Sequence, residues 1–314
     1  MKFDTATLYM EDAYLQSCNA EVLYVVPRGV VLDRTVFYLQ GGGQPGDSGT
    51  LTRDGGEPVT VVDTCRSPDG GILHVIDEGH TLQTGDEVVA TIDWERRYAH
   101  MRMHTALHVL SALIRHGVYG GRITTTRSWL DFDMPDYPNL KELTAQLNEE
   151  VEADRPVTCR WITRDELDAR PELVRTMNVE PPPLLFNIRL LEIEGLDLQP
   201  CGGTHVKSTA EIGRLAVLKI VNKGKHNRRI HLVFEEDYPA LAADDEKRSL
   251  EKKMRRAERT DQLTAELLAE LSNLERSESS APEPTEAAGD DETEDAPEAT
   301  TDPDTEYNPD RVPE

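Results

Sequence analysis

The sequence contains few cysteines and few aromatic residues for a chain of 314 residues, and it has no long hydrophobic run. The four cysteines, Cys18, Cys65, Cys159 and Cys201, are scattered and form no CxxC pair. This argues against a disulfide framework and favours a reduced, cytoplasmic compartment. No apolar run approaches the roughly 18 residues of a membrane span, and the N-terminus lacks the basic start and apolar centre of a secretory signal. We therefore expect a protein with no membrane contact.

Positive charge is also scarce, since 34 Lys and Arg residues face 59 Asp and Glu residues, for a net charge of −25. Residues 277–314 hold 14 acidic residues and one Arg, so they carry −13 and the rest of the chain carries −12. A body that is itself acidic is typical of a halophilic-type protein from a high-salt cytoplasm, and the alternative is an ordinary acidic protein that avoids nucleic acid. Because the Debye length is about 3 Å near 1 M salt, net acidity does not exclude an RNA partner.

Residue patterns divide the chain into four parts. Residues 1–92 contain short runs such as EVLYVV and VTVVD between Gly, Pro and Asp turns, which predicts a small β-barrel-like domain or a sandwich. Residues 93–238 mix helices with separated strands, starting with the helical WERRYAHMRMHTALHVLSALIRHG, and this predicts an α+β domain. Residues 239–276 predict a charged helix, and residues 277–314, which have almost nothing to bury, predict a disordered acidic tail.

The glycine-rich segment GGGQPG, residues 41–46, satisfies the G-x-G-x-x-G pattern of dinucleotide-binding proteins and follows a predicted strand. Pro45 and the DSGTLTRDGGEPV that follows leave no room for the crossover helix of such a site. No G-K-[ST] of a phosphate-binding loop is present either. From these residues alone, a flexible hairpin loop is the better interpretation.

Two spaced pairs of possible metal ligands occur in the second part of the chain. Cys201 and His205 lie four residues apart in CGGTH, and the long predicted helix contributes His104 and His108, which share one helix face. His100 extends the helical series, so either neighbouring histidine pair could bind a metal. Each pair alone is weak evidence, because half-buried histidines are often just packed. Together they form a His/Cys ligand set suited to zinc (Zn2+).

Four stretches in the same order resemble one family. LDRTVFYLQGGGQPGDSG, IDWERRYAHM, RMHTALH and CGGTHVKSTAEIG are similar to the editing region of alanyl-tRNA synthetases and to its free-standing relatives, the AlaX alanyl-tRNA editing proteins. The resemblance covers residues 8–235, and residues 240–314 match weakly or not at all. It implies a β-barrel-like N-terminal domain and a two-layer α/β editing domain of the threonyl/alanyl-tRNA synthetase second additional domain type. It also implies one zinc ion per chain, held by His104, His108, Cys201 and His205.

The resemblance implies a trans-acting hydrolase that deacylates alanine tRNA, tRNA(Ala), carrying Ser or Gly at its acceptor end. Such editing is needed because a synthetase pocket for Ala discriminates these amino acids by only about 1–3 kcal/mol. In the family, the glycine-rich segment lines the editing cleft. A hydroxyl that bonds the serine side chain is expected in the strand ITTTR, and the alternative is that this run is a strand without such a role. These expectations give Thr124 and Gln44 as catalytic residues and, as substrate-binding residues, Gly41, Gly42, Gly43, Thr125 and Thr126. Four protein ligands describe a closed metal site, so a catalytic and a substrate-positioning zinc both remain open.

Local basic residues on the acidic body are candidates for tRNA contact, and solvated surface is the alternative for each of them. They lie at the start of the metal helix and in the hairpin NKGKHNRR: Arg96, Arg97, Arg102, Lys223, Lys225, Arg228 and Arg229.

Three other functions compete with alanyl-tRNA editing. A threonyl-tRNA editing domain shares the HxxxH and CxxxH layout, but the glycine-rich segment and the CGG sequence favour alanine. A non-catalytic, zinc-stabilised RNA-binding module is the second. A ligase is the third, and it is disfavoured because only about 90 residues precede the metal helix, too few for an ATP-using synthetase core.

Overall fold

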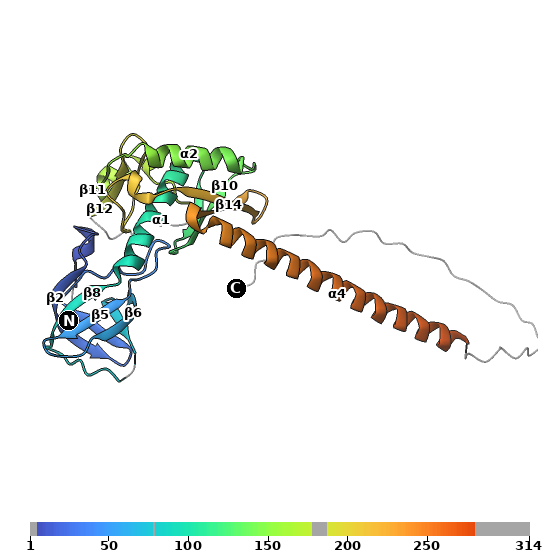
Figure 1. Cartoon of the computed structure of the whole chain (residues 1–314), viewed down its shortest axis with the longest axis horizontal. Coiled ribbons are helices and arrows are strands. Elements are labelled where there is room, and N and C mark those ends of the chain that lie inside the picture. Colours follow the sequence, from blue (N-terminus) through green and yellow to red (C-terminus); the bar gives the residue numbers. More distant parts are fainter. Residues whose placement is uncertain (1–4, 78, 178–186, 280–314) are drawn as a thin grey trace, which may run out of the picture. The chain divides into compact units, whose positions relative to one another are not determined.

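The computed structural model describes residues 5–77, 79–177 and 187–279, and the chain forms two units, Met1–Leu250 and Glu251–Glu314. The first unit begins with a closed barrel of six strands in the order β2-β3-β7-β6-β5-β8, in which every neighbouring pair is antiparallel (Figure 1). The barrel strands are β2 (Ser17–Val26), β3 (Gly29–Leu32), β5 (Gly49–Arg53), β6 (Val59–Arg66), β7 (Ile72–Ile76) and β8 (Glu87–Ile92). Two short strands, β1 (Ala6–Thr7) and β4 (Arg34–Thr35), pair beside them, and η1 (Leu8–Met10) is a 3-10 turn.

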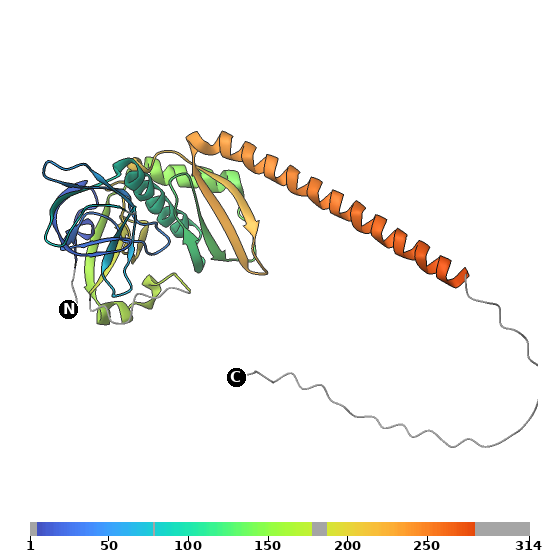
Figure 2. The ribbon, with the colours of Figure 1, turned by 90° about the horizontal axis from the view of Figure 1, so that it is seen from below.

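Alternating residues of the strands fill the interior of the barrel. Val22, Val30, Leu51, Val61 and Ala90 are completely buried, and each comes from a different strand. Because successive side chains of a strand point to opposite faces, such alternation is what a half-buried strand requires. Figure 2 shows the strands surrounding this interior. The predicted small barrel is therefore confirmed.

The remainder of the first unit combines helices with two antiparallel sheets. One sheet has the order β14-β15-β10-β9 and the other the order β11-β12-β13. Their strands are β9 (Val118–Arg122), β10 (Arg127–Asp133), β11 (Val157–Thr163), β12 (Asn187–Ile193), β13 (Asp197–Pro200), β14 (Leu215–Asn222) and β15 (Asn227–Phe234). The helices are α1 (Trp94–Leu113), α2 (Leu140–Glu152) and α3 (Arg164–Asp168), with 3-10 turns η2 (Pro171–Leu173), η3 (Thr209–Ile212) and η4 (Glu235–Asp237). The predicted mixture of helices and strands is thus confirmed.

Helix α1 is the central element of this part, because 13 of its 20 residues are buried. Asp93 precedes its first residue, and the Asp93 carboxylate accepts a hydrogen bond from the Arg96 backbone N–H and so caps the first turn. The helix is buried on nearly all sides, and its Met101, Met103 and Leu110 are inaccessible to solvent. Histidines on α1 therefore lie in the core rather than on the surface.

A buried ion pair connects α1 to the barrel. The Arg97 guanidinium contacts the Asp47 carboxylate, to which its Nε donates at 2.8 Å, and it also donates to the carbonyls of Ala13 and Val36. Removing one partner of such a pair leaves an uncompensated buried charge, at a cost of about 3–5 kcal/mol. Since Asp47 follows the glycine-rich segment directly, the pair fixes that segment against α1.

Helix α4 (Tyr238–Ser279) starts in the first unit and continues into the second. Its Asp245 forms ion pairs with Arg127 of β10 and Lys219 of β14, both within the first unit. Of the expected acidic tail, only residues 277–279 are described, and they lie in α4, whereas residues 280–314 lie outside the described residues. Among the described residues, no helix combines the length and the apolar character that crossing a membrane requires.

Candidate metal centre

The four residues expected to bind zinc come together between α1 and the loop that follows β13. His104 and His108 lie one turn apart on α1, and the CGGTH loop brings Cys201 and His205 to the same point. The Cys201 Sγ lies 3.2 Å from His205 Nε2 and 3.6 Å from His104 Nε2. One possible ligand atom from each of the four residues lies within 4.8 Å of all the others.

His100 lies outside this cluster, although its spacing on α1 fitted the series. It is buried, and its Nδ1 has no hydrogen-bond partner among the described residues. Burial lowers the pKa of His100 to about 4, and the nearby Arg96 adds to this effect. His100 is therefore a neutral core residue beside the cluster. The helical pair that meets Cys201 and His205 is the one that the family resemblance selected.

Hydrogen bonds to the Nδ1 atoms fix the tautomers of His104 and His205. The Gln44 Oε1 is an acceptor 2.9 Å from His104 Nδ1, so this nitrogen must carry the proton. The Thr105 hydroxyl donates to the Met101 carbonyl and therefore accepts from His205 Nδ1, at 3.2 Å. In both rings the proton on Nδ1 leaves the Nε2 lone pair directed at Cys201.

His108 is oriented in the same way by a carboxylate. Its Nδ1 lies 3.0 Å from the Asp197 Oδ2, which also accepts from the Gln199 side chain at 2.6 Å. Gln199 Nε2 also lies 2.9 Å from His108 Nδ1. Because both nitrogens carry a hydrogen here, they do not bond to each other, and each donates its hydrogen to the Asp197 carboxylate. A carboxylate behind a histidine raises the basicity of the nitrogen that faces a metal.

The charges within the cluster favour a thiolate. Burial alone would raise the pKa of the Cys201 thiol, but His104, His205 and His108 hold it well below its ordinary value. Burial lowers the pKa of His108, but the Cys201 thiolate and the Asp197 carboxylate outweigh burial and raise this pKa to about 9. Burial and the neighbouring His104 lower the pKa of His205 well below its ordinary value. In the absence of a metal, a proton on His108 thus balances the Cys201 thiolate, and a cation can take its place.

The donor set fits zinc. Zinc in proteins prefers tetrahedral sites of thiolate and imidazole ligands, with bonds of about 2.0–2.3 Å. One thiolate and three oriented imidazole nitrogens within 4.8 Å of one another match this chemistry. Three histidines whose other ring nitrogen is bound by a protein group also match the usual surroundings of a zinc ligand.

The glycine-rich segment lies directly against the cluster. Gly41 and Gln44 close a tight turn through two backbone hydrogen bonds, and the carbonyl of Gly43 accepts from the Ile123 N–H at 2.9 Å. At Gly43, with φ of +83°, a Cβ atom would lie 2.9 Å from the carbonyl oxygen of Gly121. This position therefore requires glycine, both for its conformation and for the close approach of β9.

Thr124, Thr125 and Thr126 do not form the strand that the sequence predicted. They make the turn between β9 and β10. The Thr124 hydroxyl donates to the Arg127 carbonyl and accepts from the Arg127 and Thr126 N–H groups, so its hydrogen-bonding capacity is used within the turn. The strand prediction was wrong because a Thr hydroxyl competes with sheet pairing by closing a local turn.

The basic residues predicted to contact tRNA differ in their exposure to solvent and in their partners. Arg97 is fully buried in its ion pair, and Arg228 is buried, with its guanidinium donating to backbone carbonyls such as that of Pro135. Neither can reach RNA, which corrects the prediction for these two residues. Arg229 donates twice to Asp131 and stacks over Trp129.

Of the other four residues predicted to contact tRNA, two make hydrogen bonds within the protein and two are exposed. Arg96 donates to the Gly46 carbonyl, and Arg102 donates to the Ile212 carbonyl while lying over the Phe234 ring. Lys223 and Lys225, at the tip of the β14–β15 hairpin, are exposed. These two lysines are therefore the most accessible of the predicted contacts.

Some residues of the site were not predicted from the sequence. Asp197 and Gln199 lie on one face of β13, and Cys201 continues the same spacing of two just past the end of the strand, so this period of two was the available signal. Arg189 of β12 is buried and donates to the carbonyls of Cys201 and Gly203, which holds the CGGTH loop. No sequence signal indicated its partners, because they are backbone atoms.

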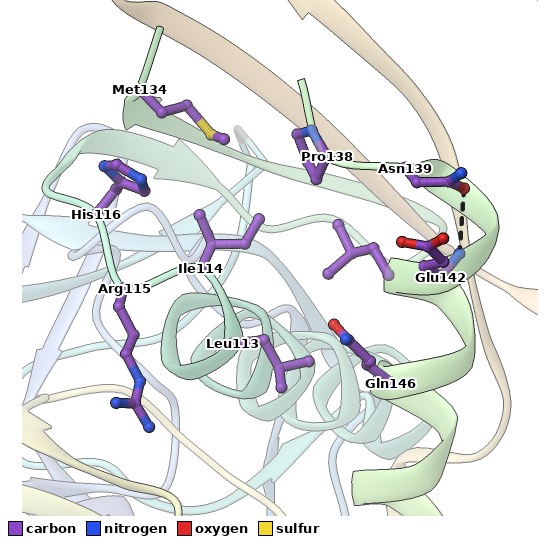
Figure 3. Close-up of a pocket in the computed structure, with 10 residues that line it drawn as sticks. Leu113, Ile114, Arg115, His116, Met134, Pro138, Asn139, Glu142 and Gln146 are labelled. Atoms are coloured by element: carbon purple, nitrogen blue, oxygen red, sulfur yellow. Dashed lines mark hydrogen bonds between the residues drawn. The ribbon is translucent and has the colours of Figure 1, made fainter. Parts of the chain in front are cut away.

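A second hollow lies apart from the cluster, between the C-terminal end of α1 and the start of α2 (Figure 3). Its lining includes Leu113, Ile114, Arg115, His116 and Met134. It shares no lining residue with the cluster and contains none of the predicted site residues.

Comparison with known proteins connects both parts of the first unit to tRNA synthetases. Residues 5–96 match the family model of class II (A) tRNA synthetases. Residues 188–231, which include Cys201 and His205, match the model of the threonyl and alanyl tRNA synthetase second additional domain. Fold and site thus define a protein of the class that carries this additional domain.

Curated relatives narrow the class further. The alanyl-tRNA editing protein AlaX-M of Saccharolobus solfataricus is 37% identical over 231 residues, which cover 72% of this chain and 98% of the relative. The AlaX-M protein of Methanosarcina barkeri is 37% identical over 240 residues, covering 73% and 99%. The alanine–tRNA ligase of Pyrobaculum arsenaticum is 39% identical over 230 residues, but these are only 25% of that ligase. The chain belongs to the AlaX-M family of alanyl-tRNA editing proteins. The predicted resemblance to AlaX proteins is therefore confirmed.

Proposed function

We propose that this protein is a trans-acting editing hydrolase that cleaves the ester between a wrong amino acid and the acceptor end of tRNA(Ala). The observation that carries the proposal is the cluster of Cys201 and three histidines with oriented lone pairs, in a chain of the AlaX-M family. A threonyl-tRNA editing domain is not favoured, because the relatives with nearly full-length coverage are alanyl-tRNA editing proteins. The match to a quarter of a ligase supports deacylation without amino-acid activation.

The proposed cofactor is one zinc ion, held by His104, His108, Cys201 and His205. When bound, zinc supplies a Lewis acid that can polarise or position an ester carbonyl. Gln44 keeps His104 in the tautomer that can bind the metal, so we propose that Gln44 acts through His104 rather than on the ester itself.

We propose serine as the preferred wrong amino acid, recognised through a hydroxyl of the β9–β10 turn. Alanine is smaller than serine, so size alone cannot exclude the correct ester. A group that bonds the serine hydroxyl would be left unpaired by alanine, at a cost of about 1–3 kcal/mol, or roughly ten- to hundredfold in rate. Thr124 uses its hydroxyl within the turn. Thr125 is half-buried, and no hydrogen bond of its hydroxyl to another described residue is found, so Thr125 is the better candidate.

The test is deacylation by the full-length, zinc-loaded protein of tRNA(Ala) charged with Ser, Gly or Ala. We expect Ser-tRNA(Ala) to be hydrolysed at least tenfold faster than Ala-tRNA(Ala). Thr125→Val should abolish most of this selectivity, whereas Thr124→Val, the matched control, should keep the selectivity and lose stability. Absence of hydrolysis of all three substrates would contradict the proposal and leave a non-catalytic RNA-binding module. Loss of selectivity only in Thr124→Val would return the role to that residue.

A further inference from the structure

The chain alternates strongly in charge around the middle of α4. Residues 1–246 carry a net charge of −14, residues 247–259 carry +5, and residues 260–314 carry −16. A short cationic segment therefore lies between two acidic ones. Charge patterning of this kind indicates a local interaction surface, because net acidity alone would not retain a concentrated group of cations.

Four of these cations form one stripe on the helix. Lys252, Arg255, Arg256 and Arg259 stand at positions i, i+3, i+4 and i+7, are all exposed, and line one shallow hollow. At roughly 100° per residue, they fall within a sector about 100° wide. Glu251 and Glu258 fall outside that sector by the same geometry. We call these four residues the basic stripe.

Among the side chains that the structure describes, the basic stripe lacks the partners that engage cations elsewhere in the protein. On α4 these are the side chains of residues 238–260, 262 and 269, and no ion pair with them or with any other described side chain involves a member of the stripe. Arg229, in contrast, is paired with Asp131, and Arg127 with Asp245. Like charges at i and i+4, as in Lys252 and Arg256, repel each other and destabilise a helix. A polyanion would relieve this repulsion.

We propose that the basic stripe binds the sugar–phosphate backbone of the tRNA substrate. Three of its four members are arginines, whose planar guanidinium groups bind phosphate oxygens through paired hydrogen bonds. Binding of this kind neutralises phosphates without reading the sequence. The identity of the RNA rests on the proposed function, whereas the preference for a polyanion rests on the helix itself.

A membrane surface is a poorer partner for this helix. Basic helices that lie on membranes carry a broad apolar face with aromatic or leucine residues opposite the cations. Across from the basic stripe, the described residues offer Leu250 and Met254, exposed by 60% and 56%, and no aromatic residue. Two apolar side chains do not make such a face.

The experiment compares two double variants of the full-length, zinc-loaded protein. Lys252→Gln/Arg256→Gln removes two charges from the basic stripe. Lys247→Gln/Lys253→Gln removes two charges from exposed positions of the same helix outside the stripe. Both variants change the net charge equally and introduce the same residue. The stripe variant removes one Lys and one Arg, the control removes two Lys, and the main difference between them is the helix face.

We expect the stripe variant to raise the KM for Ser-tRNA(Ala) about tenfold, with kcat and zinc content unchanged, which corresponds to about 1.4 kcal/mol. The slope of log affinity for uncharged tRNA against log salt should also fall by about two. The control variant should resemble the wild type. Equal effects in both variants would overturn the proposal in favour of a net-charge effect. A stripe variant that binds tRNA as tightly as the wild type would also overturn it, and this result is expected if acidic residues 277–314 occupied the stripe.

A third outcome would also overturn the proposal, namely a stripe variant that loses binding to anionic lipid vesicles while its binding to tRNA is unchanged. Failure of the proposed function is recognised separately, because the wild type would then deacylate no charged tRNA. The binding of uncharged tRNA would still test the basic stripe in that case.

Discussion

Gly203 lies where the CGGTH loop passes closest to His104. A Cβ atom at this position would lie 2.1 Å from the His104 Cε1 and 2.4 Å from its Nδ1, and 3.0 Å from the Gln44 Oε1. Real Cβ atoms do not approach other atoms so closely, so Gly203→Ala must displace the imidazole ring or the loop. Displacing the ring breaks its hydrogen bond to Gln44, and displacing the loop moves Cys201 and His205.

Gly203→Ala should therefore weaken zinc binding while the protein still folds. Forcing one methyl group into a packed site costs about 1–3 kcal/mol, and losing the orienting contact of a metal ligand weakens metal binding by roughly 10- to 100-fold. Gly202→Ala is the matched control, because a Cβ at Gly202 has no atom within 4 Å. Competition with a chelator measures zinc affinity, and circular dichroism measures the fold.

The reasoning would be refuted by a Gly203→Ala protein that binds zinc as tightly as the wild type. It would equally be refuted if Gly202→Ala weakened zinc binding to the same extent. In that case the loop would need glycine for its flexibility rather than for the space beside His104.

Two further predictions concern the metal ligands and a buried histidine of the barrel. His104→Ala and Cys201→Ala should each lose stoichiometric zinc in metal analysis, while His100→Ala, one turn away on α1, should retain it. Retention of zinc in both His104→Ala and Cys201→Ala would contradict the assignment of the ligands. Burial lowers the pKa of His74 to about 4, below the value of about 6.5 in an unfolded chain, so the unfolded state takes up the proton first and stability falls as pH drops from 6.5 towards 4. At about 1.4 kcal/mol per pKa unit, the loss in the free energy of unfolding is about 3 kcal/mol. Urea unfolding at pH 7 and pH 4 measures it, and between these pH values His74→Asn should lose about 3 kcal/mol less stability than the wild type.

Local patterns in the sequence were sufficient for the elements that carry the site. The spacing of His104 and His108 placed both on one face of α1, and short β-branched runs between Gly, Pro and Asp turns predicted the barrel strands. The choice between His100 and His108 was not decided by spacing, since both series fit a helix. Similarity to a known family selected His108, and the positions of Cys201 and His205 in the fold agree with this choice.

Contacts between distant segments were decided only by the tertiary structure. No local pattern predicted that Gln44 contacts His104 across 60 residues, or that Asp197 contacts His108 across 89. These contacts depend on how the barrel and β13 pack against α1, which no local period encodes. The same packing buries Arg97, a residue that the sequence predicted to be exposed, because a charge can be buried when its partner comes from another element. Even a local structure could not be predicted at Thr124. A Thr residue there can continue a strand or close a turn with its hydroxyl, and only the structure shows that the hydroxyl closes the turn between β9 and β10.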